Sequence, residues 1–242
     1  VKCNSCGIIY LDNFPDKQRI DDVYENDRFN YSAYYDCHRS DDLISFSSRL
    51  KLLEYYAPKK ESSTILDYGC STGNFMEVAI KRGYLVEGIE PNKSSVFICK
   101  KKGFVVNENL PKSYDLLHAR DVIEHVPEPL VFLRELNYFL KEDGILMLST
   151  PDFDKWVTKK TQIKPDEHLF YFTKKTLGHY LEQSGFKILY LNNCSRKRSI
   201  SSLLHSSTSQ DRKILLFLKI FNFLRLGLII NLLISNLNDD IL

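Results

Sequence analysis

The 242-residue sequence has the size and composition of one substantial α/β domain with appendages, since 43% of its residues are hydrophobic. A net charge of only +2 argues against the strongly basic character of nucleic-acid-binding domains. The charge is uneven, because residues 193–242 carry seven Lys or Arg against three acids, or +4, which leaves −2 for residues 1–192. Six scattered cysteines form no dense disulfide pattern, so a reducing, cytoplasmic setting is expected.

A cysteine pair opens the chain. Cys3 and Cys6 form a C-x-x-C motif, which supplies half of the ligands of a structural zinc site. The adjacent Cys37 and His38 are poorly spaced for the same metal, so no bound metal is expected in this chain. Residues 12–42 are polar, acidic and aromatic, and they form either an irregular arm packed on the domain or a lid over a ligand site. Residues 1–42 are therefore assigned to an N-terminal arm.

A glycine-containing loop follows the first strong strand signal. A helix is expected over 43–56 and a strand from Thr64, and the strand leads through residues 67–73 into a helix near 75–82. A strand, a tight turn and a helix N-terminus build nucleotide sites in α/β folds. Gly69 and Gly73 let the backbone turn and approach a ligand. A dinucleotide fingerprint would need further glycines at positions 71 and 74, where this chain has Ser71 and Asn74.

Strand and helix signals then alternate. Strands are expected over 84–90, 104–106, 114–119, 145–150 and 186–191, helices over 94–102, 130–140 and 174–184, and a turn over 141–144. The alternation predicts a Rossmann-like, doubly wound α/β fold with a mostly parallel seven-stranded sheet and helices on both faces. The last strand would be antiparallel and would begin at 239–242, cut short.

Six motifs together resemble a known family. The D-x-G-x-S-x-G loop (67–73) resembles motif I of the class I S-adenosylmethionine (SAM) methyltransferases, with Ser71 in place of the middle glycine. E-H-V-x-x-P (124–129), L-K-x-x-G (140–144), S-T-P (149–151), H-L-x-Y-F-T (168–173) and S-G-F (184–186) follow in order. Over about 40–192 the chain resembles the SAM methyltransferases related to the ubiquinone-biosynthesis O-methyltransferase and to zinc-module sugar methyltransferases. Residues 43–192 are accordingly expected to be the SAM-binding domain.

The resemblance implies a SAM site at the carboxyl ends of the strands. Asp67 should face the amino group of SAM, and Glu90, at the end of the next strand, should hold both ribose hydroxyls. The expected cofactor contacts are Asp67, Gly69, Cys70, Ser71, Gly73, Phe75, Glu90, Pro91, Asn107 and Arg120.

Catalysis is expected just beyond the fourth strand. His125 has a suitable pKa for a general base, and the resemblance implies this role, with Glu124 contacting the substrate. The alternative is that His125 caps the following helix or bonds to the backbone. His168 and Tyr171 are secondary substrate contacts, whose alternative role is packing of their loop.

Residues 193–242 differ in character from the domain and form a basic, apolar segment that is interpreted as a helical insert or cap. Residues 212–234 are strongly apolar, and their polar residues, at six-residue steps, mark no single helix face. Lys219 or Arg225 near the centre would each oppose membrane insertion by about 2.5–3.5 kcal/mol. A cap over the substrate site or a homodimer contact is therefore favoured over a peripheral membrane patch, and a true membrane span ranks last.

The expected function is SAM-dependent methyl transfer to a small-molecule acceptor, favoured as a sugar or sugar nucleotide of a surface-polysaccharide or secondary-metabolite pathway. Alternatives are O-methylation of a quinone-like phenol or lipid-linked acceptor, and a non-catalytic SAM-binding scaffold. A nucleic-acid methyltransferase is disfavoured, because residues 120–123 lack the Asn/Asp-Pro-Pro-aromatic motif. The expected location is cytoplasmic, with membrane association as the alternative.

Overall fold

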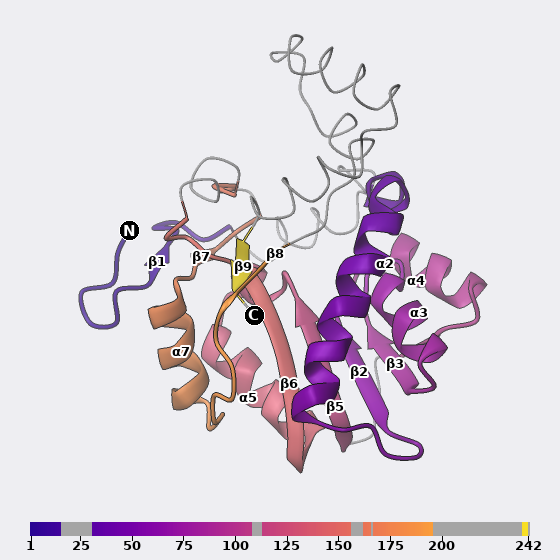
Figure 1. The fold of residues 1–242 in the computed structure, drawn as a ribbon. Coiled ribbons are helices and arrows are strands. Elements are labelled where there is room, and N and C mark those ends of the chain that lie inside the picture. Colours follow the sequence, from indigo (N-terminus) through magenta and orange to yellow (C-terminus); the bar gives the residue numbers. More distant parts are fainter. Residues whose placement is uncertain (16–30, 108–112, 156–161, 166, 196–238, 242) are drawn as a thin grey trace, which may run out of the picture.

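A computed structural model describes residues 1–15, 31–107, 113–155, 162–165, 167–195 and 239–241, with side chains from His38 to Cys194 within those ranges and over 1–15. Its centre is a seven-stranded sheet in the order β4-β3-β2-β5-β6-β9-β8 (Figure 1). The strands are β2 (Thr64–Tyr68), β3 (Leu85–Ile89), β4 (Val105–Val106), β5 (Tyr114–Arg120), β6 (Leu140–Pro151), β8 (Asn193–Ser195) and β9 (Asp239–Ile241).

The sheet has the expected doubly wound form. The pairs β2–β3, β2–β5, β3–β4 and β5–β6 are parallel, whereas β9 lies antiparallel between β6 and β8. Neighbouring residues of one strand face opposite layers, so Ile65 packs in one core cluster and Leu66 in the other. Both are fully buried, which is why the strand reads as a continuous apolar run.

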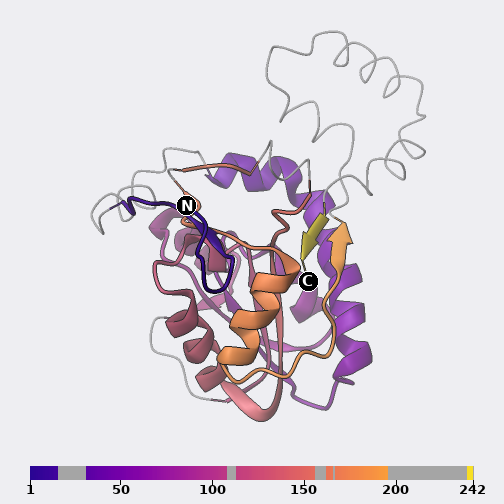
Figure 2. The same cartoon turned by 90° about the vertical axis from the view of Figure 1, so that its left-hand side faces the viewer.

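Helices cover both faces of this sheet. The helices α2 (Tyr31–Tyr56), α3 (Asn74–Lys81) and α4 (Lys93–Lys101) pack on one side, and α5 (Pro129–Phe139) and α7 (Lys174–Gln183) on the other (Figure 1). Asn92 caps α4 by accepting from Ser95 N at 2.8 Å. A capping box between Thr173 and Thr176 starts α7, which faces the viewer in Figure 2.

Three expectations from the sequence were wrong. The helix before β2 begins at Tyr31 rather than at residue 43, so it includes part of the presumed arm. Residues 141–144 are strand rather than turn, because Tyr114 pairs with Leu140 across a register irregularity that extends β6. Residues 186–191 are not a strand; β8 is formed later, at Asn193–Ser195, where β9 supplies a hydrogen-bonding partner. Phe186 and Leu191 pack instead against the core on the α5–α7 side.

A small two-stranded ribbon lies beside the main sheet. β1 (Ile9–Tyr10) pairs antiparallel with β7 (Phe170–Tyr171), and neither strand was predicted. Leu11 N also donates to Leu169 O at 3.0 Å. The short 3₁₀ helix η1 (Ile123–His125) follows β5, and Leu169 N donates to Glu124 O at 2.8 Å. The ribbon therefore ties the first residues of the chain to the segment that holds His168.

Candidate functional site

The loop after β2 has the left-handed backbone conformation that glycine permits. Gly69 and Gly73 have φ of 77° and 82°, and Ser71 adopts 48°. A Cβ on Gly69 would lie 2.6 Å from Val122 Cγ2, so a side chain cannot fit there. The N–H groups of Gly69 and Cys70 donate to Ile89 O at 2.9 and 3.0 Å, which fixes the loop against the end of β3.

Glu90 is held in place by that loop. Its Oε2 accepts from Ser71 N at 2.8 Å and its Oε1 accepts from Asn92 N at 2.9 Å. Burial raises the pKa of Glu90, and the two backbone N–H groups counteract part of this rise. Each carboxylate oxygen keeps a further lone pair, so Glu90 can still accept two hydroxyl hydrogens from a ligand.

Asp67 presents an oxygen that the described residues leave unsatisfied. Its Oδ1 accepts from His118 Nδ1 at 2.6 Å, whereas no described group hydrogen-bonds to its buried Oδ2. Burial lowers the pKa of His118, although the charge of Asp67 acts in the opposite direction. An unsatisfied buried carboxylate oxygen is costly without a partner. This oxygen can therefore accept a hydrogen bond from a donor group of a ligand.

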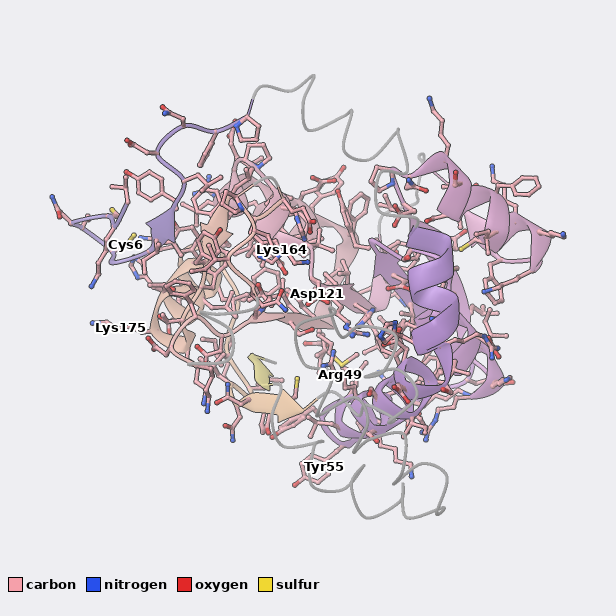
Figure 3. The ribbon with its side chains drawn as sticks, turned by 90° about the horizontal axis from the view of Figure 1, so that it is seen from above. Cys6, Arg49, Tyr55, Asp121, Lys164 and Lys175 are labelled. Carbon is pink, nitrogen blue, oxygen red and sulfur yellow. The ribbon has the colours of Figure 1, made fainter. Side chains whose placement is uncertain are left out.

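Sequence reasoning missed the contribution of α2. Asp42 and Arg49 are 8% and 4% exposed, and they face the strand ends from this helix. Arg49 Nη1 donates to Ser149 Oγ at 3.2 Å, and Asp42 Oδ1 accepts from Arg120 Nη1 at 3.2 Å. Figure 3 shows Arg49 on the α2 side of Asp121, with Lys164 on the opposite side. The signal was a polar stripe at helical spacing (His38, Asp42, Ser45, Arg49), which would normally indicate a solvated face.

The other expected cofactor residues differ in how far they are exposed. Phe75 is buried, with its ring stacked 3.8 Å from His118, and Cys70 is buried with a thiol whose pKa is raised by its contact with Cys99 and by burial. Pro91 and Asn107 are exposed near the end of β3 and beyond β4. Arg120 lies at the end of β5 with its guanidinium 4.8 Å from the Phe46 ring centre. Their contacts with SAM stay predictions.

A second group of polar residues gathers beyond β5. Glu124 is 2% exposed, and its Oε2 accepts from Thr150 Oγ1 at 2.9 Å. His125 Nδ1 lies 2.8 Å from Glu167 O, and His168 Nδ1 lies 2.9 Å from Gln162 O. The two imidazole rings meet edge to face at 4.8 Å. The structure thus brings together three of the four residues expected at the acceptor end.

Burial disfavours the charged form of both imidazoles. It lowers the pKa of His125, against the opposing effect of the Glu167 carbonyl, and it lowers the pKa of His168 to about 3. Tyr171 is not part of this cluster, since its ring centre lies 6.2 Å from that of His168; burial raises the pKa of its hydroxyl, and the main chain of Lys164 acts in the opposite direction.

Two sets of residues are relevant to a metal. One ligand atom each from Glu124, His125 and His168 lies within 4.8 Å of the others, so this set could hold a metal ion. In the described part of the chain no third such ligand joins Cys3 and Cys6. The C-x-x-C turn itself is ordered by Gly7 N donating to Cys3 O at 3.0 Å and Cys3 N donating to Ile8 O at 2.8 Å. Half of a zinc site therefore stays the prediction for this pair.

Comparison with known proteins agrees with this geometry. Residues 37–191 match a family model described as a methyltransferase domain. The chain is 28% identical over 121 residues to the ubiquinone biosynthesis O-methyltransferase of Histophilus somni, covering 43% of this chain and 51% of that protein. The corresponding protein of Actinobacillus pleuropneumoniae serotype 7 is 27% identical over 120 residues, covering 42% and 51%. The chain thus spans about half the length of these curated relatives.

Solved structures show the same fold. A SAM-dependent methyltransferase of Thermotoga maritima, described as a possible histamine N-methyltransferase, has a TM-score of 0.55 at 22% identity, covering 73% of this chain and 84% of that one. Coclaurine N-methyltransferase, solved with N-methylheliamine and SAH, has a TM-score of 0.50 at 18% identity, covering 64% of this chain and 52% of that one. Among the described residues, no helix has the length and apolarity required to cross a membrane, and residues 212–234 lie outside them.

Proposed function

Because the chain belongs to the SAM-dependent methyltransferase domain family, we propose that it transfers a methyl group from SAM to a hydroxyl of a small-molecule acceptor. The observation that carries this proposal is the state of His125. A carbonyl oxygen can only accept, so the Nδ1 atom of His125 carries the proton and donates to Glu167 O. Its Nε2 therefore has a lone pair with which to take a proton at the expected acceptor position.

The residues at the strand ends fit SAM. Asp67 Oδ2 would accept from the amino group, Glu90 from the ribose hydroxyls, and the buried Arg49 guanidinium would pair with the carboxylate of the methionine part. Two observations support this arrangement: Asp67 Oδ2 is buried without a hydrogen-bond partner among the described residues, and the N–H groups of Ser71 and Asn92 fix the Glu90 carboxylate. When bound, SAM supplies an activated methyl group on a sulfonium, so the protein mainly has to align it with the acceptor and exclude water.

The acceptor hydroxyl must lose its proton as the methyl group is transferred. We assign this proton to His125 Nε2, which has a lone pair to receive it because Nδ1 donates to Glu167 O. Glu124 would orient the same acceptor, since Thr150 fixes its carboxylate. The backbone contact of His125 with Glu167 O sets the tautomer of its ring.

A sugar or sugar nucleotide is the favoured acceptor. The formed C-x-x-C turn at Cys3–Cys6 supports the likeness to zinc-module sugar methyltransferases. The similarity to ubiquinone biosynthesis O-methyltransferases favours the second candidate, a quinone-like phenol or a lipid-linked acceptor. If the acceptor is hydrophobic or lipid-linked, residues 212–234 would provide a peripheral membrane contact. If the acceptor is a sugar, the same residues would cap the site or join two copies of the chain. A cytoplasmic location fits either candidate.

Calorimetric titration with SAM, with NADH as the control, tests the cofactor first. We expect saturable binding of SAM and none of NADH. Sugar nucleotides and quinone-like phenols would then be compared as acceptors by SAH release. Binding without turnover on either class would support a SAM-binding scaffold, and absence of SAM binding would contradict the proposal.

A further inference from the structure

His118 lies beside Asp67 at the centre of the sheet. The parallel register of β2 and β5 makes the two residues direct neighbours, and neighbours in register point to the same face of a sheet. The distance from His118 Nδ1 to Asp67 Oδ1 is 2.6 Å, and the two side chains are 4% and 2% exposed. The hydrogen bond between them is therefore shielded from water, where it is stronger than at the surface.

Two phenylalanine rings hold the imidazole of His118 in one orientation. Phe75, in the first turn of α3, stacks on it with the ring centres 3.8 Å apart and an interplanar angle of 19°. Phe46, on α2, meets it edge to face at 5.5 Å. A polar ring is costly to bury between apolar rings, and a leucine or phenylalanine would fill the same space without that cost. A role that an apolar side chain cannot perform therefore has to explain the imidazole.

The hydrogen bond of His118 fixes the direction in which Asp67 presents its other oxygen. The last torsion of an Asp side chain is broad on its own, so a carboxylate without a partner samples many orientations. With Oδ1 held by His118, Oδ2 keeps one position, where it is buried and has no hydrogen-bond partner among the described residues. An acceptor that is oriented before the ligand arrives loses less conformational freedom on binding, so affinity is higher.

We infer that His118 is a positioning residue of the cofactor site, and that it orients Asp67 for the amino group of SAM. The inference rests on the proposed function, in which Asp67 Oδ2 accepts from that amino group. An ionised carboxylate can only accept, so Nδ1 of His118 carries the proton of their hydrogen bond. His118 acts through Asp67 and not on SAM itself.

An imidazole suits this role better than a lysine or an arginine. Burial lowers the pKa of His118; the charge of Asp67 acts in the opposite direction. The charges of Arg49 and Arg120 add to the effect of burial. In its neutral form the ring donates to Asp67 without cancelling the carboxylate charge, so that charge is left for the ammonium group of the ligand. A permanent cation at this position would neutralise Asp67 and repel the ammonium.

Calorimetric titration with two nucleosides tests the inference in the full chain. SAH carries the amino group, and 5′-S-(3-carboxypropyl)-5′-thioadenosine is the same molecule without it. The wild-type chain should bind SAH at least about tenfold more tightly than this deamino analogue. His118→Phe keeps a ring between the two phenylalanines but removes the donor, so the ratio of the two affinities should fall to about threefold or less. His118→Asn, whose NH₂ group can lie where Nδ1 lies, should restore most of the ratio.

Controls separate positioning from folding. Leu116→Val changes the same layer of β5 beside Ile65 rather than Asp67, so it should keep the wild-type ratio. Thermal unfolding of each variant reports whether it is folded, and His118→Leu replaces His118→Phe if the larger ring does not fit. NMR of the wild-type chain labelled with ¹⁵N-histidine should show a protonated Nδ1 and a bare Nε2 at His118 at about pH 8, above the ordinary histidine pKa.

Several results would overturn the inference while SAH still binds and the proposed function stands. The wild-type chain could bind the two nucleosides equally, or the variant without the donor could keep the wild-type ratio, as it would if His118 only packs. A ratio in His118→Asn as low as in His118→Phe, or a bare Nδ1 with a protonated Nε2, would also overturn it. Failure of the wild-type chain to bind SAH would contradict the proposed function and, with it, the inference.

Discussion

Replacement of Glu90 by Gln tests the SAM site most directly. The Glu90 carboxylate already accepts from Ser71 N and Asn92 N, at 2.8 and 2.9 Å, and two further lone pairs are left for the ribose hydroxyls. Hydrogen bonds to a charged group contribute about 1.5–3 kcal/mol each. The amide keeps one acceptor oxygen and turns its NH₂ group toward a backbone N–H. We therefore expect a loss of about 3–6 kcal/mol in SAM affinity, or about 10²- to 10⁴-fold.

The assay is calorimetric titration of SAM into the wild-type chain, Glu90→Gln and Glu87→Gln. Glu87 lies on the same strand but accepts from the Tyr114 hydroxyl, away from the loop, so its variant should bind within about twofold of wild type. Thermal unfolding of the three proteins controls for folding. Binding by Glu90→Gln within about threefold of wild type would refute the ribose assignment, because the carboxylate would then act only as a brace for the loop.

Three further predictions concern Asp67, His125 and His168. Asp67→Asn keeps an acceptor for His118 but turns an NH₂ group toward the ligand amino group, so SAM affinity should fall by about 10- to 100-fold in the same titration; unchanged affinity would contradict the assignment of Oδ2. His125→Gln should leave SAM affinity intact and lower kcat by about 10²- to 10⁴-fold, and full turnover would remove His125 as the base. The pKa of His168, about 3 when folded against about 6.5 unfolded, means that the unfolded state binds more protons between these values. Stability should therefore fall as the pH falls below 6.5, by about 2 kcal/mol between pH 7 and pH 5 from this residue. His168→Phe should reduce that slope in urea denaturation, and equal slopes would contradict the lowered pKa.

Much of the proposed cofactor site follows from local sequence. The spacing from Asp67 to Gly73 specifies a strand end and a turn whose backbone needs glycine, as the φ values of 77° and 82° confirm. Glu90 could be placed because parallel neighbouring strands bring their carboxyl ends to one edge. In both cases the interacting residues lie in one βαβ unit, so chain connectivity alone restricts their relative positions.

For the proposed acceptor end, the sequence indicated which residues to consider but not how they contact one another. His125 and His168 were both expected there, yet their contact depends on Leu169 N donating to Glu124 O, a bond between distant segments. Their tautomers depend on the carbonyls of Glu167 and Gln162, which are aimed by the local fold of the backbone rather than by residue type. Neither the contact between the two histidines nor their tautomers can be read from the periodicity of the sequence.

The sequence by itself determined the fold class, the position of the glycine-containing loop after β2 and the identity of the acidic residues at the strand ends, because hydrophobic period, glycine and strand register are local properties. Only the tertiary structure decided which face of α2 is buried. Asp42 and Arg49 appear solvated in the sequence, but packing on the strand ends places them beside Arg120 and Ser149. It also decided that residues 193–195, rather than 186–191, form the strand next to β9, because a strand exists only where a neighbour completes its hydrogen bonds.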